Sequence, residues 1–215
     1  MSAVRRTPER LRGWRLNVFT MPRSLPRQVT GPVVAVLARL GVTPNMLTVA
    51  QLLGGFGAAV LIASGELAWG GVAVLASASI DAFDGTLART TGRVTRFGGV
   101  FDSTVDRLFE GVVLGGLLWY YLDLGLRDES MLVFVTAVGS LSVSYVRARA
   151  EVERVQLYDG LFTRAVRIIV LAAGLVAGEV VAVLWLLAVM TIFTTLQRLF
   201  VTWQKLRDTD TGGAP

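Results

Sequence analysis

The sequence predicts an all-α, polytopic membrane protein with six transmembrane helices preceded by a cytoplasmic juxtamembrane helix. Of its 215 residues, 53% are hydrophobic, and the mean hydropathy is +0.59. The apolar residues are gathered into long runs without charge, such as residues 46–64. A run of about 20 apolar residues is long enough to cross the hydrocarbon core of a bilayer.

The first part of the chain is basic rather than apolar. Residues 1–42 are expected to form an arm in the cytoplasm and at the membrane surface, with a short interfacial helix at 31–40. Thr43 and Pro44 then stand where a helix should begin, which places the first span at about 45–64.

Five further spans follow, and one division between them needs an argument. Residues 168–197 contain a single charge, Glu179, and are too long for one ordinary span. We therefore expect a turn at Gly174, Gly178 and Glu179. The six-helix membrane domain is expected at 43–207, and a disordered tail at 208–215. The later spans are expected at about 67–89, 98–122, 131–151, 162–178 and 180–205.

Arginine and lysine collect on one side of these predicted spans. Arg89, Arg93 and Arg96 lie between the second and third spans, whereas Glu66 and Glu179 lie in loops of the opposite side. Loops rich in Lys and Arg stay in the cytoplasm. We therefore expect a multi-pass protein of the cell membrane with both termini in the cytoplasm, which an even number of spans allows.

The composition limits the chemistry. The sequence has no cysteine and no histidine, which excludes disulfides, thiolate metal sites and histidine as base or ligand. A metal must then be held by oxygen, which favours Mg²⁺ or Mn²⁺. The net charge is +5. In a chain this apolar, we expect membrane lipid and a phosphorylated substrate as partners, and no nucleic acid.

Four aspartates form the most informative pattern. Asp81 and Asp84 are three residues apart at the end of the second span, and Asp102 and Asp106 are four apart at the start of the third. Each pair therefore shares a helix face, and the short loop between the spans makes the two helices antiparallel neighbours. Divalent cations are the natural compensation for four converging carboxylates, and two metals about 3.5–4 Å apart are usual for displacement at phosphorus. Gly85 lets a ligand approach the helix backbone. The alternative is a set of helix-end charges paired with nearby arginines.

The pattern Asp-x-x-Asp-Gly-x-x-Ala-Arg at 81–89, followed after eight residues by Gly-x-x-x-Asp-x-x-x-Asp at 98–106, resembles the signature of the CDP-alcohol phosphotransferase family. The resemblance implies six membrane helices, usually as a homodimer, and an active site facing the cytoplasm. It implies that two Mg²⁺ or Mn²⁺ ions are held by the four aspartates, and that Asp106 is also the catalytic base. A carboxylate base agrees with the absence of histidine. The residues that the resemblance implies for CDP-lipid binding are Asn45, Met46, Leu47, Thr48, Gly85, Arg89 and Thr95.

Shorter motifs at 102–107, 144–151, 164–170 and 197–199 resemble a narrower branch, the actinobacterial phosphatidylinositol-phosphate synthases. That branch joins CDP-diacylglycerol to inositol 1-phosphate. Arginines from four different spans stand at one depth, and arginine suits bidentate phosphate binding. Either they hold the acceptor's phosphate, as the branch implies, or they serve topology alone. The four are Arg107, Arg147, Arg164 and Arg198.

Three alternatives stay open. The branch usually carries lysine where Arg147 stands, so glycerol 3-phosphate is a second candidate acceptor. Carboxylates inside membrane helices also mark ion paths, so a metal-ion transporter is an alternative of another class. A non-catalytic membrane scaffold is the third. The position of the aspartates at one membrane face, without repeated halves, favours the enzyme.

Overall fold

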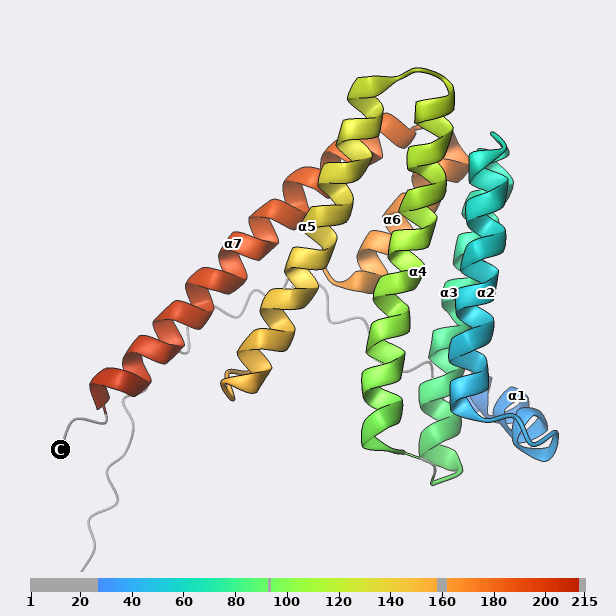
Figure 1. Cartoon of the computed structure of the whole chain (residues 1–215). Coiled ribbons are helices and arrows are strands. Elements are labelled where there is room, and N and C mark those ends of the chain that lie inside the picture. Colours follow the sequence, from blue (N-terminus) through green and yellow to red (C-terminus); the bar gives the residue numbers. More distant parts are fainter. Residues whose placement is uncertain (1–26, 93, 158–161, 213–215) are drawn as a thin grey trace, which may run out of the picture.

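The computed structural model describes residues 27–92, 94–157 and 162–212, and its regular elements there are all helices (Figure 1). The all-α prediction is confirmed. The helices are α1 (Arg27–Arg39), α2 (Pro44–Ala63), α3 (Leu67–Thr90), α4 (Arg96–Asp123), α5 (Arg127–Val152), α6 (Arg164–Ala177) and α7 (Val180–Gly212).

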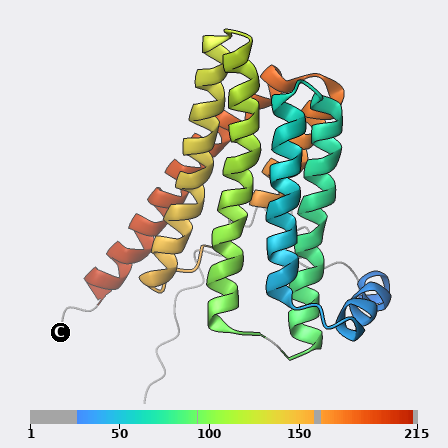
Figure 2. The ribbon, with the colours of Figure 1, turned by 45° about the vertical axis from the view of Figure 1, so that its right-hand side comes forward.

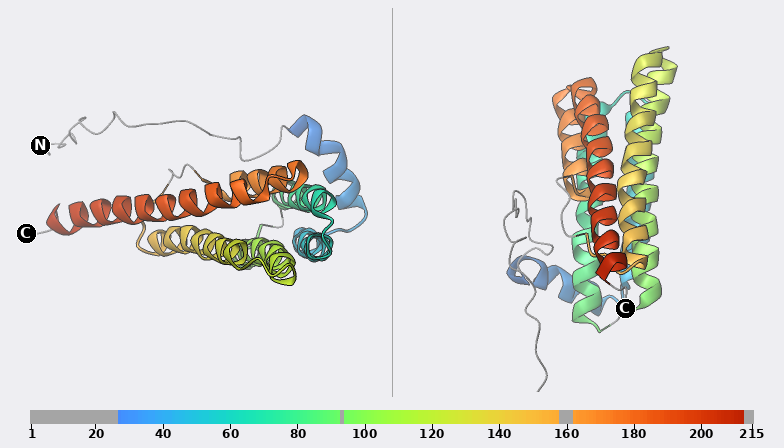
Figure 3. Two further views of the ribbon diagram at one scale, coloured as in Figure 1. Left: turned by 90° about the horizontal axis from the view of Figure 1, so that it is seen from above. Right: turned by 90° about the vertical axis from the view of Figure 1, so that its left-hand side faces the viewer.

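Helices α2 to α7 form two layers of three. One layer holds α2, α4 and α5, and the other holds α3, α6 and α7 (Figure 3). The layers are joined where α2 packs on α3 and where α5 packs on α7, so the six helices close into a ring. The core contains fully buried side chains such as Phe109 and Leu117 of α4, Ile62 of α2 and Leu184 of α7. Gly116 allows α4 to approach α2 closely, because a Cβ at this position would lie 2.8 Å from the Cα of Ala59.

The connections alternate between the two ends of the bundle. The α2–α3, α4–α5 and α6–α7 turns lie at the upper end in Figure 1, and the α3–α4 loop lies at the lower end, where α1 crosses beside α2 and α3 (Figures 1 and 2). The predicted turn between the last two spans is confirmed at Gly178 and Glu179, whereas Gly174 lies inside α6. Gly178 ends α6 with φ +77°, a conformation that glycine adopts without strain.

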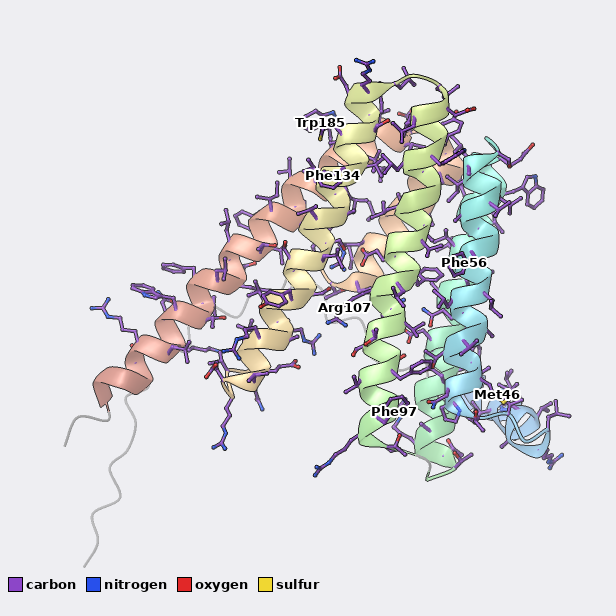
Figure 4. The ribbon with its side chains drawn as sticks, viewed as in Figure 1. Met46, Phe56, Phe97, Arg107, Phe134 and Trp185 are labelled. Atoms are coloured by element: carbon purple, nitrogen blue, oxygen red, sulfur yellow. The ribbon has the colours of Figure 1, made fainter. Side chains whose placement is uncertain are left out.

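The length and apolar composition of the helices indicate a multi-pass membrane protein. Four of the described helices, α2, α3, α5 and α7, are long and apolar enough to cross a bilayer, two fewer than the six predicted spans. Helix α4 has 28 residues, but its stretch from 102 to 110 carries four charged residues, Asp102, Asp106, Arg107 and Glu110. Helix α6 has 14 residues, or about 21 Å of helix against a core of about 30 Å. Phe56, Phe134 and Trp185 point away from the bundle, as lipid-facing side chains do (Figure 4).

Three expectations differ from the structure. Helix α1 begins at Arg27 rather than 31 and keeps Gly31 and Pro32 inside it. The packing of α1 on α3, with Val34 buried, supports the helix in spite of these residues. Helices α3 and α4, which we expected to be direct neighbours, each pack mainly on α2.

The third difference concerns the end of the chain. Helix α7 continues to Gly212, so the first residues of the expected disordered tail are helical. Leu206 packs on a small cluster around Ala150 and Leu157, which holds this end of α7 against the end of α5. Residues 1–26 of the predicted arm and 213–215 of the tail lie outside the described residues.

Candidate active site

Three of the four predicted aspartates come together between the two layers. Asp81 of α3 and Asp102 and Asp106 of α4 each present a carboxylate oxygen, and these oxygens lie within 4.8 Å of one another. All three side chains are partly buried. An all-oxygen set of this kind suits a hard divalent cation such as Mg²⁺ or Mn²⁺.

Asp84 is not part of this close group. It is buried, and its Oδ2 accepts a hydrogen bond from Oγ1 of Thr48 at 3.1 Å. Thr48 belongs to α2, which lies against both α3 and α4. The sequence pattern therefore predicted three members of the cluster, while the fourth carboxylate is held to α2.

The cluster of Asp81, Asp102 and Asp106 is called the acidic group below. Arg164, predicted to bind the acceptor, contacts this group directly. Its Nη1 lies 2.8 Å from Oδ1 of Asp106 and 3.2 Å from Oδ2 of Asp81. Its guanidinium also lies over the ring of Phe109, 5.8 Å from the ring centre. Because α6 is short and begins part of the way along the bundle, its first residue reaches the aspartates (Figure 1).

A cavity of about 290 Å³ adjoins the acidic group and is lined by α4, α5, α6 and α7. Asp106 lines it as well, so the carboxylates and the cavity form one continuous site. The four predicted arginines all line this cavity; Arg107 is labelled on α4 in Figure 4. The hydroxyl groups in its wall belong to Ser103, Ser144 and Thr163.

These arginines have different surroundings. Arg107 donates to the backbone oxygen of Ser103, and the buried Arg198 donates to the backbone oxygen of Val143 at 2.8 Å. Arg147 is exposed and forms an ion pair with Glu151 at 2.9 Å. Arg147 on α5 is therefore exposed to solvent, whereas Arg198 on α7 is fixed by its contact with the backbone.

A buried ion pair in the wall of the cavity was missed from the sequence. Nε and Nη2 of Arg167 each lie 2.8 Å from an oxygen of Glu110, and Ser140 donates to the same carboxylate. Nη1 of Arg167 donates to the backbone oxygen of Phe162 at 3.2 Å. The contacts join α4, α5 and α6 one turn from Arg164. A glutamate inside a predicted membrane span was the signal that could have revealed the pair.

The residues expected to contact the CDP-lipid gather where α2 begins, α3 ends and α4 begins. Met46 and Phe97 mark this end of the bundle in Figure 4. Asn45 and Met46 are exposed, Leu47 is partly buried, and Thr48 faces Asp84. A Cβ on Gly85 would lie 3.3 Å from Nη1 of Arg89, so that guanidinium covers the glycine. Thr95 caps α4, because its Oγ1 accepts from the backbone N–H of Gly98 at 2.9 Å.

Comparison with known proteins finds relatives that match most of the chain. A phosphatidylinositol phosphate synthase of Mycobacterium marinum is 35% identical over 195 residues, covering 85% of this chain and 83% of that protein. An archaetidylinositol phosphate synthase of Methanothermobacter thermautotrophicus is 35% identical over 175 residues, covering 79% of this chain and 87% of that protein.

The fold also matches solved structures. The Mycobacterium tuberculosis phosphatidylinositol phosphate synthase with CDP-DAG bound superposes with a TM-score of 0.76 at 32% identity, covering 82% of this chain and 94% of that one. The same enzyme in complex with manganese and citrate gives a TM-score of 0.75 at 32% identity, over 81% of this chain and 88% of that one.

The sequence profile of CDP-alcohol phosphatidyltransferases matches residues 41–204, which include the acidic group and the four predicted arginines of the cavity. Divalent metal use in this family agrees with the three clustered aspartates. The chain therefore belongs to the CDP-alcohol phosphatidyltransferase family, whose members are enzymes.

Proposed function

We propose that the protein transfers a phosphatidyl group from CDP-diacylglycerol to inositol 1-phosphate, giving phosphatidylinositol phosphate and CMP. The observation that carries this proposal is the cavity lined by arginines from four helices beside the acidic group. Arg107 and Arg198 donate to backbone oxygens and form no ion pair among the described residues, so an acceptor without a phosphate would leave them without an anion. A phosphorylated polyol would meet the arginines and the hydroxyl groups of the wall. The two named relatives differ in their lipid and share inositol phosphate, which supports this acceptor.

Each site residue then has a role. Asp81, Asp84, Asp102 and Asp106 hold two Mg²⁺ or Mn²⁺ ions, which when bound neutralise the pyrophosphate and the charge that develops on the leaving CMP. The acceptor hydroxyl oxygen attacks the β-phosphorus, the bond to CMP breaks, and CMP leaves with the electron pair. Asp106 accepts the hydroxyl proton, because its carboxylate lines both the acidic group and the cavity.

The CDP-lipid is held at the neighbouring end of the bundle. The start of α2, from Asn45 to Thr48, contacts the nucleotide together with Gly85, Arg89 and Thr95. Gly85 lets the Arg89 guanidinium lie against α3, where it supplies a cation for the pyrophosphate. The acceptor's phosphate is held by Arg107, Arg147, Arg164 and Arg198.

The topology follows from charge. We infer six membrane crossings, in which α4 and α6 are added to the four apolar spans. The catalytic domain at 43–207 then lies between the basic arm at 1–42 and the tail at 208–215. Exposed arginines such as Arg89, Arg96, Arg149 and Arg207 lie at the ends of helices on the side of the acidic group. This distribution supports a cell-membrane protein whose site and both termini face the cytoplasm. The active form is a homodimer.

The test is an assay of CMP release. Purified protein with Mg²⁺ and CDP-diacylglycerol is offered inositol 1-phosphate, glycerol 3-phosphate, free inositol or serine. We expect turnover with inositol 1-phosphate and little with free inositol. Turnover with glycerol 3-phosphate alone would replace the proposed acceptor, and metal transport into vesicles without CMP release would favour the transporter.

Arg147→Ala tests the acceptor side. We expect the KM for inositol 1-phosphate to rise about ten- to hundred-fold, because a charge-assisted contact to an anion is worth about 1.5–3 kcal/mol. The KM for CDP-diacylglycerol should stay nearly constant. Arg149→Ala is the matched control, since Arg149 is also exposed on α5 and pairs with a glutamate four residues on, yet does not line the cavity. Equal effects of the two substitutions, or a loss of CDP-lipid affinity in Arg147→Ala, would contradict the assignment.

Gly85→Leu tests the donor side. A leucine side chain would displace the Arg89 guanidinium from its place over α3. We expect the KM for the CDP-lipid to rise about tenfold or more, as for the loss of one charged contact. Gly57→Leu on α2 adds the same side chain at an exposed position with open space, so it should leave the KM unchanged. An unaltered KM in Gly85→Leu would remove Gly85 from the donor site.

A further inference from the structure

Gln51 is a polar side chain in an otherwise apolar stretch of α2. It is fully buried, at 0% exposure, and neither Nε2 nor Oε1 has a hydrogen-bond partner of good geometry among the described residues. Burial of an amide in this state costs stability, since its hydrogen bonds to water are not replaced. A leucine or methionine would fill the same space without that cost.

The surroundings of Gln51 place it at the edge of the acidic group. It lies one turn after Thr48, on the same face of α2, and Thr48 contacts Asp84 of α3. The Gln51 amide lies within reach of the Asp106 carboxylate on α4, although the geometry falls short of a well-formed hydrogen bond. Helix α2 therefore directs two successive polar side chains at two different aspartates of the site.

The close packing of α2 on α4 fixes this arrangement. Gly55, one turn after Gln51, has the ring of Phe109 against it, and a Cβ there would lie 2.9 Å from Cε2 of that ring. This contact keeps the face of α2 that carries Gln51 close to α4. Asp106 also meets Arg164, so its carboxylate has both a cation and a neutral amide as neighbours.

We propose that Gln51 is a positioning residue, whose amide N–H donates to the Asp106 carboxylate and holds it in the orientation that accepts the acceptor's proton. This inference rests on the proposed function. A neutral donor can orient a carboxylate without adding a positive charge that competes with bound metal. Arg164, which is a cation, does add such a charge. Catalytic hydrogen bonds are often poorly aligned until substrate binds, so we expect this one to form fully when the acceptor enters the site.

The test is Gln51→Met, which keeps the length of the side chain and removes its polar atoms. We expect kcat to fall about ten- to hundred-fold, the loss that corresponds to one hydrogen bond to a charged group. The KM for CDP-diacylglycerol should change less than about threefold, since Gln51 faces the base and not the donor. The Tm of the purified protein without substrate should rise or stay constant, because a poorly paired buried amide has been removed.

Gln51→Leu repeats the test with a second side chain, in case methionine does not pack. Thr194→Val is the control, since Thr194 is equally buried but lies in α7 outside the cavity, where its hydroxyl donates to the backbone oxygen of Met190. It should retain the activity of the native protein.

The outcomes separate the two proposals. If the native protein releases no CMP, the proposed function fails. If the native protein is active and both Gln51 variants match it, the positioning role is wrong. If kcat and Tm fall together in both variants, Gln51 supports the fold and the positioning role is also wrong. A fall in kcat at an undiminished Tm is the result that supports it.

Discussion

Asp106→Asn is expected to lower kcat by about 10²–10⁴-fold, the usual contribution of a general base, in a protein that remains folded. Asparagine has nearly the same shape as aspartate but does not accept a proton at neutral pH. The fold should persist, because Arg164 keeps its second carboxylate partner, Asp81, at 3.2 Å. The measurement is the rate of CMP release at saturating substrates, with the Tm recorded alongside.

Asp123→Asn is the control for this substitution. Asp123 is exposed at the other end of α4, away from the cavity, so its replacement should leave kcat unchanged. Near-native turnover in folded Asp106→Asn would show that another group takes the proton. In that case Asp102, which belongs to the same group of carboxylates, would be the next residue to replace.

The sequence predicted the parts of the site that depend on spacing within one helix. Asp102 and Asp106 share a face of α4 because they are four residues apart, and Asp81 meets them, as the pattern indicates. The convergence of arginines from four spans was also predicted, since each stands at a similar depth along its helix, and all four line one cavity.

The parts that were missed depend on how helices are rotated and placed against one another. The spacing of residues does not reveal that α2 packs against both α3 and α4. This packing brings Thr48 to Asp84 and Gln51 close to Asp106. The spacing also does not reveal that α6 has only 14 residues, which brings Arg164 onto the aspartates. Such features depend on tertiary packing, about which local periodicity carries little information.

The buried pair of Glu110 and Arg167 should be the most sensitive point of the fold. Arg167 is 3% exposed and Glu110 is 8% exposed, so loss of the arginine leaves a carboxylate without its partner in the bundle. We expect Arg167→Met to lower the free energy of unfolding by about 3–5 kcal/mol, as for other buried pairs broken on one side. Denaturation of the purified protein in detergent measures this change.

A double substitution separates the pair from the packing around it. Glu110→Gln with Arg167→Met removes both charges, and Ser140 can still donate to the amide oxygen at position 110. The double variant should therefore be more stable than Arg167→Met alone, because no buried charge remains unpaired. Arg149→Met is the surface control, since its pair with Glu153 is exposed and should contribute about 1 kcal/mol or less. Equal destabilisation in the single and double variants would mean that the arginine acts through its contact with the backbone oxygen of Phe162, at the entry to α6, and not through its charge.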